Sequence, residues 1–218
     1  MIRRRALLFD LDGTLIDSYE AIHESLNVAL ARAGMPPRDA ASVRRMVGRG
    51  LDVLVAEVMG PERAPEGVRD YREHYGKVCF EKTRLLPGVA PTLERLASDG
   101  HAMAICTNKL ASFSRALVDH LGVGGFFALV LGPEHVKEPK PDPGMLLLAL
   151  EKLGADRRDA LYVGDMAMDV TVARAAGVEV AVLPTGSSSR EELASAGADH
   201  LLEVFADLPA VIGPGAGA

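Results

Sequence analysis

Short apolar runs alternate along the chain with longer segments of helical periodicity. Five runs are continuously apolar and bounded by polar residues, glycine or proline, at 6–9, 102–106, 127–131, 160–163 and 178–183. Continuous apolarity of this length is typical of strands buried on both faces of a parallel sheet. Between them, four helical segments end near a glycine, at 89–98, 110–121, 144–153 and 170–176. The alternation predicts an α/β core with a doubly wound, mostly parallel, Rossmann-like sheet.

The interval from residue 17 to residue 86 departs from this alternation, because it contains no convincing strand. Apolar residues recur there at helical spacing in three stretches, 18–33, 43–59 and 65–80. A loop of this length without secondary structure would be unusual in a compact domain. We therefore predict a smaller all-helical domain at 17–87, called the helical insertion below, and a discontinuous core at 1–16 and 88–218. The glycine-rich end, 213–218, is predicted to be disordered.

Composition narrows the classes of function and partner. The chain has 218 residues, of which 48% are hydrophobic, enough for a large core with a smaller companion. Its 24 basic and 30 acidic residues give a net charge of −6, which argues against nucleic acid as a partner. No segment fits a signal peptide or a membrane span. The two cysteines, Cys79 and Cys106, form no metal-binding pattern, and a reducing, cytoplasmic location is predicted.

Two carboxylates directly follow the first apolar run, in the sequence Phe9-Asp10-Leu11-Asp12-Gly13-Thr14. Burying an unpaired carboxylate is costly, so their position beside a buried strand calls for a reason. In an extended chain, residues i and i+2 point to the same face. The carboxylates of Asp10 and Asp12 would then repel each other unless a cation lay between them. The motif therefore predicts a bound cation.

Polar residues also follow the other predicted strands, where ligands bind in doubly wound sheets. Thr107 and Asn108 follow the second strand, and Lys140 lies in a proline-rich loop after the third. Asp165 follows the fourth strand, and Asp169 comes four residues later, a spacing that suits two oxygen ligands for Mg²⁺. Each feature has a simpler alternative: the two acids could only cap the next helix, and Thr107-Asn108 could likewise be a cap.

Taken together, these motifs resemble the haloacid dehalogenase superfamily over essentially the whole chain. The first motif is the Asp10–Thr14 sequence, the second is Thr107, and the third is Lys140 before Pro-Asp-Pro. The fourth is Gly-Asp-Met-Ala-Met-Asp, ending at Asp169, with Met166 where the family usually has a small polar residue. The helical insertion resembles the small cap of the phosphoglycolate phosphatase-like branch. The resemblance implies a Mg²⁺-dependent phosphatase.

The resemblance also implies roles for the acidic residues. Asp10 would be the nucleophile that forms an aspartyl phosphate, which water then hydrolyses. Asp12 would protonate the leaving oxygen and later accept a proton from the attacking water. Mg²⁺ would be held by Asp10, by the backbone carbonyl of Asp12 and by Asp165, with Asp169 bound directly or through water. The ion would let the acidic cluster coexist and would neutralise the phosphoryl oxygens.

Substrate binding is expected from both domains. Lys140, Thr107 and the backbone amide of Asn108 would stabilise the transferring phosphoryl group. In the helical insertion, Val-Gly-Arg-Gly around Arg49 interrupts two helical stretches and resembles the cap segment that faces the core in phosphoglycolate phosphatases. Arg49 could hold a carboxylate or a second phosphate. The alternative is a solvated arginine on a helix-breaking turn.

Several functions remain open at this point. The predicted partner is a small anionic phosphorylated metabolite such as 2-phosphoglycolate, bound by a monomer or homodimer. An inorganic pyrophosphatase or a sugar phosphomutase of the same superfamily is the alternative. A non-enzymatic receiver domain also uses an acidic cluster, a threonine and a lysine, but the insertion and the second aspartate of the first motif speak against it. The same aspartate disfavours a dehalogenase.

Overall fold

The core is a six-stranded parallel sheet in a computed structural model that describes residues 6–212. The strands are β1 (Ala6–Phe9), β4 (Ala102–Cys106), β5 (Leu129–Leu131), β6 (Ala160–Gly164), β7 (Glu179–Val182) and β8 (His200–Leu201). Their order is β5-β4-β1-β6-β7-β8, and every neighbouring pair is parallel. The chain runs outward from β1 to β5, then crosses back to β6 on the other side of β1. This is the order of a doubly wound sheet, and the predicted fold class is confirmed.

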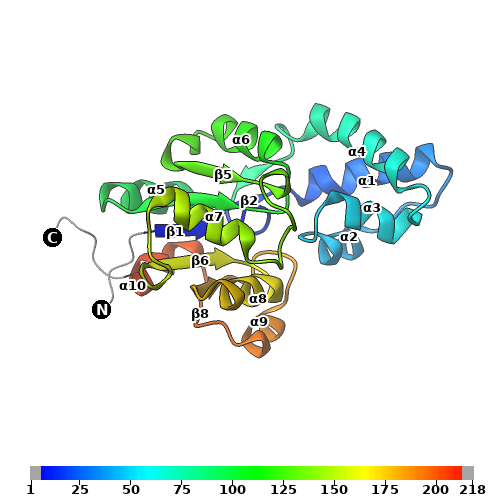
Figure 1. The fold of residues 1–218 in the computed structure, drawn as a ribbon. Coiled ribbons are helices and arrows are strands. Elements are labelled where there is room, and N and C mark those ends of the chain that lie inside the picture. The colour runs from blue at the N-terminus through cyan, green and yellow to red at the C-terminus, as the bar shows by residue number, and fades with distance from the viewer. Residues whose placement is uncertain (1–5, 213–218) are drawn as a thin grey trace.

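The inner strands β1, β4, β6 and β7 bury both of their faces. On β1, Leu7 and Phe9 belong to one apolar cluster, while Ala6 and Leu8 belong to the other. The first cluster includes side chains of α5 (Val89–Ser98), α6 (Ala111–His120) and α10 (Leu208–Ile212), and the second includes side chains of α7 (Gly144–Leu153), α8 (Ala167–Ala176) and α9 (Arg190–Ala196). These helices flank the sheet in Figure 1. Burial on both faces explains why the strands are apolar without alternation.

The helical insertion lies beyond one end of the sheet in Figure 1. Its helices are α1 (Tyr19–Arg32), α2 (Ala40–Met46), α3 (Leu51–Met59) and α4 (Ala64–Val78). The chain enters and leaves it through two short antiparallel strands, β2 (Ile16–Asp17) and β3 (Arg84–Leu85). The expectation that this interval contains no strand is therefore wrong for β3. A two-residue strand is too short to produce a recognisable apolar pattern.

Other boundaries differ from those expected. The stretch 43–59 is divided between α2 and α3, and Gly48 and Gly50 between them have φ of 117° and 96°. Side-chain-bearing residues rarely adopt such angles, which explains the break. Helix α8 begins at Ala167 rather than 170, and β8, α9 and α10 were not predicted. The tail 213–218, expected to be disordered, lies outside the described residues. Within residues 6–212, the helices are too short or too polar to cross a lipid bilayer.

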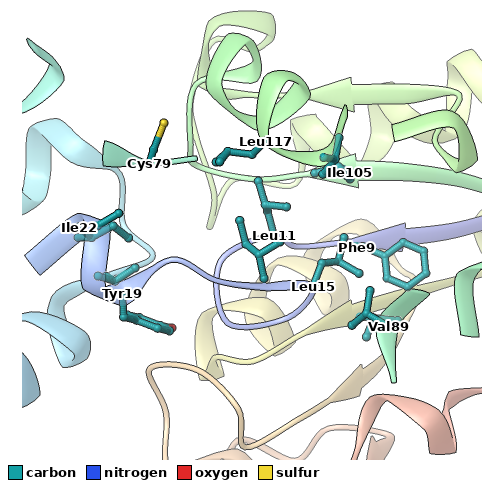
Figure 2. Packing of buried hydrophobic residues seen from close by; sticks show 14 of the residues in the cluster. Phe9, Leu11, Leu15, Tyr19, Ile22, Cys79, Val89, Ile105 and Leu117 are labelled. Atoms are coloured by element: carbon teal, nitrogen blue, oxygen red, sulfur yellow. The ribbon is translucent and has the colours of Figure 1, made fainter. Parts of the chain in front are cut away.

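One apolar cluster extends from the sheet into the helical insertion. Figure 2 shows Phe9 on β1, Leu11 and Leu15 in the following loop, and Ile22 on α1 within this cluster. Leu11, Leu15 and Phe9 are completely buried. Burying an aliphatic or aromatic side chain of this size stabilises a fold by roughly 1.5–3 kcal/mol. The packing therefore holds the loop that carries Asp10 and Asp12 between the core and the insertion.

Candidate active site

The polar residues expected at the ends of the strands lie at the carboxyl edge of the sheet. Asp10 follows β1, Thr107 follows β4, and Asp165 follows β6, which is the neighbour of β1 on the other side. Because the strand order reverses at β1, the loops on its two sides diverge and leave a crevice. Lys140, in the loop before α7, reaches the same place.

Three carboxylates and one ammonium group form the buried centre of this crevice. One carboxylate oxygen from each of Asp10, Asp165 and Asp169 lies within 4.8 Å of the others. The Nζ of Lys140 lies 3.1 Å from Asp10 Oδ1 and 3.0 Å from Asp169 Oδ1. Burial raises the pKa of Asp10 to about 6, although Lys140 opposes this. Burial also raises the pKa of Asp165 well above its ordinary value, and Asp169 adds to the effect.

Asp165 is fixed by donors on both sides. The hydroxyl of Thr14 donates to Oδ1 at 2.9 Å, and the backbone N–H of Ser187 donates to Oδ2 at 3.0 Å. Gly13 and Gly186 pack so closely against this carboxylate that a Cβ on either would overlap it. The glycine of the first motif is thus required by packing as well as by its φ of 85°.

Asp169 orients its neighbours. Its Oδ2 accepts the backbone N–H groups of Asp165 and Met166, at 3.1 and 3.0 Å, so it caps the start of α8. Its Oδ1 accepts hydrogen bonds from Lys140 Nζ at 3.0 Å and from the Tyr162 hydroxyl at 2.9 Å. The helix cap offered as the simpler alternative is therefore present, and the same side chain also holds Lys140. Four donors occupy its two oxygens.

Tyr162 is a site residue that the sequence analysis missed. It is completely buried on β6, and its hydroxyl accepts a hydrogen bond from Lys140 Nζ at 2.7 Å. A single hydroxyl within the apolar run Ala-Leu-Tyr-Val was the only available signal. With Asp169, Tyr162 keeps the ammonium group of Lys140 beside Asp10.

Asp10 is buried beside a single ammonium group. The residue is only 4% exposed, and its Oδ1 pairs with Lys140 Nζ at 3.1 Å without a well-oriented hydrogen bond from any described residue. Buried negative charge is costly unless enough positive charge lies beside it. Three buried carboxylates with one ammonium group between them therefore fit a hard divalent cation such as Mg²⁺.

Asp12 forms an ion pair with Lys109, separate from the pair between Asp10 and Lys140. Lys109 Nζ donates to both of its oxygens, at 3.0 and 2.8 Å, and the Ser18 hydroxyl donates to Oδ1 at 2.5 Å. The two aspartates of the first motif do line the same cavity. Each of them pairs with a different lysine, Asp10 with Lys140 and Asp12 with Lys109. Lys109 was missed, although it directly follows Thr107-Asn108 in the sequence.

The Asn108 side chain links the core to the helical insertion. Its Nδ2 donates to the backbone oxygens of Gly48 and Lys140, both at 3.0 Å, and its Oδ1 accepts the Lys140 N–H at 2.9 Å. Thr107 is buried, and its Oγ1 accepts the backbone N–H of Lys109 at 3.3 Å. The side chain of Asn108 thus has a positioning contact that its predicted role, a backbone amide donor, did not include.

A cavity of about 170 Å³ lies between the insertion and the core. Asp10, Asp12, Thr107 and Asn108 line its core side. Most of the remaining wall is apolar or aromatic and comes from both parts of the chain: Ile22, Val47, Leu51, Leu54, Tyr71, Tyr75, Leu110 and Phe113. Arg49 also lines this cavity; its side chain is exposed. Within residues 6–212, no hydrogen bond or ion pair engages the guanidinium group of Arg49.

Three buried acids and a lysine at the switch point of a doubly wound sheet, beside a helical insertion, are typical of a hydrolase site rather than of a dinucleotide-binding one. A family model of haloacid dehalogenase-like hydrolases matches residues 7–183. The chain belongs to this family, as the sequence motifs indicated.

Two relatives with the same name match nearly the whole chain. Phosphoglycolate phosphatase from Yersinia pseudotuberculosis is 37% identical over 216 residues, which are 96% of this chain and 93% of that protein. The enzyme of the same name from Rhodospirillum rubrum is also 37% identical, over 94% of this chain and 89% of that protein. The crystal structure of a predicted phosphoglycolate phosphatase from Haemophilus somnus has a TM-score of 0.91 and 28% identity, and the match covers 98% of this chain and 100% of that chain.

Proposed function

We propose that the protein is a Mg²⁺-dependent phosphatase that hydrolyses a small anionic phosphomonoester, such as 2-phosphoglycolate, through an aspartyl phosphate. The observation that carries this proposal is the buried carboxylate of Asp10, which lies at the end of β1, pairs with Lys140 and lines a cavity. An attacking carboxylate needs a free lone pair, a nearby positive charge and access to its substrate. The relatives named phosphoglycolate phosphatase support the same substrate class.

In the proposed reaction, an oxygen of Asp10 attacks phosphorus and the ester oxygen leaves with a proton from Asp12. Asp12 then accepts a proton from the water that hydrolyses the aspartyl phosphate. Asp10, the backbone carbonyl of Asp12 and Asp165 would hold Mg²⁺, which supplies positive charge to the phosphoryl oxygens. Lys109 and the Ser18 hydroxyl orient the carboxylate of Asp12 toward the cavity.

The other core residues bind the phosphoryl group. Lys140 is held by Tyr162 and Asp169, so its ammonium group is in place before substrate arrives. Such preorganisation lowers the barrier, because no side chain has to move as charge develops. Thr107 and the backbone amide of Asn108 are proposed to bind the remaining phosphoryl oxygens. Because four donors already occupy the oxygens of Asp169, we place this residue in contact with the ion through water.

The helical insertion, residues 17–87, is proposed to act as a cap over the core formed by 1–16 and 88–218. The cavity beneath it, about 170 Å³, suits a leaving group of a few atoms. Arg49, unpaired among the described residues and facing this cavity, is proposed to select a leaving group that carries a negative charge. Cys79 and Cys106 are buried free thiols, in keeping with a proposed cytoplasmic location.

The test is phosphate release from 2-phosphoglycolate, p-nitrophenyl phosphate and pyrophosphate, with Mg²⁺ and with chelator. We expect the phosphoglycolate reaction to be fastest, to require Mg²⁺ and to be abolished by Asp10→Asn, which keeps the shape of the side chain but removes the nucleophile. Turnover by Asp10→Asn at the wild-type rate, or in excess chelator, would exclude the mechanism. Preference for pyrophosphate would favour the alternative function.

Arg49→Ala separates the specificity proposal from the core chemistry. Losing a charge-assisted contact of about 1.5–3 kcal/mol should lower kcat/KM for 2-phosphoglycolate by roughly 10- to 150-fold, mainly through KM. Hydrolysis of p-nitrophenyl phosphate should change far less. Arg45→Ala is the matched control, because Arg45 is an exposed arginine nearby in the same segment. Equal losses on both substrates would refute the role of Arg49 and leave the core mechanism intact.

A further inference from the structure

Arg44, near the end of α2, binds a loop of the core through two hydrogen bonds. Its Nε donates to the backbone oxygen of Gly186 at 3.0 Å, and its Nη2 donates to that of Thr185 at 2.7 Å. The guanidinium carbon lies 4.1 Å from the centre of the Tyr19 ring, so the group is also stacked. A guanidinium group that donates to two adjacent carbonyl oxygens and also stacks on an aromatic ring is held in one orientation, whereas a solvated arginine is not.

The same loop also contacts the acidic site. The backbone N–H of Ser187 donates to Asp165 Oδ2 at 3.0 Å. The Thr185 hydroxyl donates to the backbone oxygen of Gly13 at 2.6 Å, in the first motif. Gly186 leaves no space for a side chain, because a Cβ there would overlap the carboxylate of Asp165. Residues 185–187 thus contact both the guanidinium group of Arg44 and the carboxylate of Asp165.

Four residues beyond Arg44, the same segment contacts two more core loops. Gly48 accepts the hydrogen bond from Asn108 that was described above. A Cβ on Gly48 would lie 2.1 Å from the sulfur of Met166, the residue that follows Asp165. The Met166 side chain, unusual for this motif, therefore fills the space against Gly48. Segment 44–48 of the helical insertion contacts all three loops that carry or hold Asp165, Lys140 and Asp169.

We propose that Arg44 is a positioning residue that couples docking of the helical insertion to the geometry of Asp165, and thereby to Mg²⁺ binding. When the insertion is docked, Arg44 holds residues 185–187 in place, and the N–H of Ser187 orients the carboxylate of Asp165. Without the two hydrogen bonds from Arg44, residues 185–187 are less restrained. The carboxylate of Asp165 then no longer has a donor in a fixed position. The inference rests on the proposed Mg²⁺ site, but it does not depend on which phosphoester is the substrate.

The experiment is calorimetric titration of Mg²⁺ into the metal-free full-length protein, with kcat and KM measured in parallel. Arg44→Met keeps an unbranched side chain and removes both donors, while Arg44→Lys keeps the charge and one possible bond. Loss of a hydrogen-bonding partner of a metal ligand typically weakens metal binding about 10- to 100-fold. We expect the Kd for Mg²⁺ to rise by that factor in Arg44→Met and by less in Arg44→Lys. At saturating Mg²⁺, kcat should fall while KM changes little, opposite to Arg49→Ala.

Arg45→Met, on the exposed side of the same helical turn, is the control and should bind Mg²⁺ like the wild type. Wild-type Mg²⁺ affinity in both Arg44 variants would overturn the proposal, even if their thermal stability were reduced, because the role would then be structural only. Absence of Mg²⁺ binding by the wild type would overturn it as well. If Arg44→Met does not fold, Arg44→Lys carries the test. A wild type that hydrolyses no phosphoester, yet binds Mg²⁺ in an Arg44-dependent way, would refute the proposed function and support this inference.

Discussion

Replacing Gly13 by alanine tests whether the loop of the first motif is as tightly packed as the structure indicates. Gly13 has a φ of 85°, and a Cβ there would lie 2.6 Å from the Tyr19 hydroxyl and 2.7 Å from both Asp165 Oδ2 and the Cα of Gly186. A side-chain-bearing residue in the left-handed region costs about 1–2 kcal/mol. Forcing a methyl group into close-packed surroundings costs about 1–3 kcal/mol more. Gly13→Ala should therefore destabilise the fold by roughly 2–5 kcal/mol.

Gly34→Ala is the matched control for this substitution. Gly34 has a φ of 68°, but a Cβ there would meet no atom within 4 Å. Only the backbone strain remains, so the expected cost is about 1–2 kcal/mol. The comparison separates strain from overlap with Asp165, since both variants replace the same residue type in a similar backbone conformation.

Thermal unfolding and phosphatase assays give the two readouts. For a domain of about this size, 1 kcal/mol corresponds to roughly 2–4 °C in Tm. We expect Gly13→Ala to lower Tm by about 4–20 °C and Gly34→Ala by about 2–8 °C. Gly13→Ala should also lose most of its turnover, because the added methyl group displaces Asp165, whereas Gly34→Ala should keep its activity. Equal loss of Tm and full activity in both would refute the packing argument.

Two further predictions concern the acids of the first motif. Asp12→Asn should still bind Mg²⁺ in calorimetry, because the backbone carbonyl of residue 12 is unchanged. Its kcat should fall by about 10²–10⁴-fold, because the proton donor is lost. A fall in kcat of less than about tenfold would mean that another group supplies the proton. For the metal-free protein, burial raises the pKa of Asp10 from its ordinary 3.8 to about 6. The folded protein therefore binds a proton at Asp10 more tightly than the unfolded chain does, which stabilises the fold by an amount of the order of 3 kcal/mol. This contribution is fully present below pH 3.8 and is lost as pH rises through about 6. Tm in chelator should fall as pH rises from about 4 to about 6, and Mg²⁺ should remove the fall. A Tm in chelator that stays constant or rises would contradict this.

Much of the core could be predicted because its signals are local. A strand buried on both faces must be continuously apolar, and β1, β4 and β6 were recognised for that reason within one residue of their ends. The terminal elements were missed because their signals are weak: β8 has two residues and α10 has five. The division between α2 and α3 was foreseen only as an interruption at Arg49, whereas its cause is the positive φ of the flanking glycines.

The sequence by itself determined which chemical groups stand at the carboxyl edge of the sheet. Parallel strands end at one edge, so Asp10, Thr107 and Asp165 had to approach one another once their strands were recognised. The proline-rich loop after the third strand added Lys140, and the spacing of four residues from Asp165 added Asp169; the structure brings both to the same place.

Only the tertiary structure decided which donor holds which acid. Lys109 pairs with Asp12 across 97 positions of the chain, and Arg44 bonds to Gly186 across 142. A hydrogen bond forms or fails over a few tenths of an ångström, and no local pattern encodes the distance between such residues. The periodicity of the chain therefore predicts where carboxylates gather, while their partners depend on how the helical insertion packs against the core.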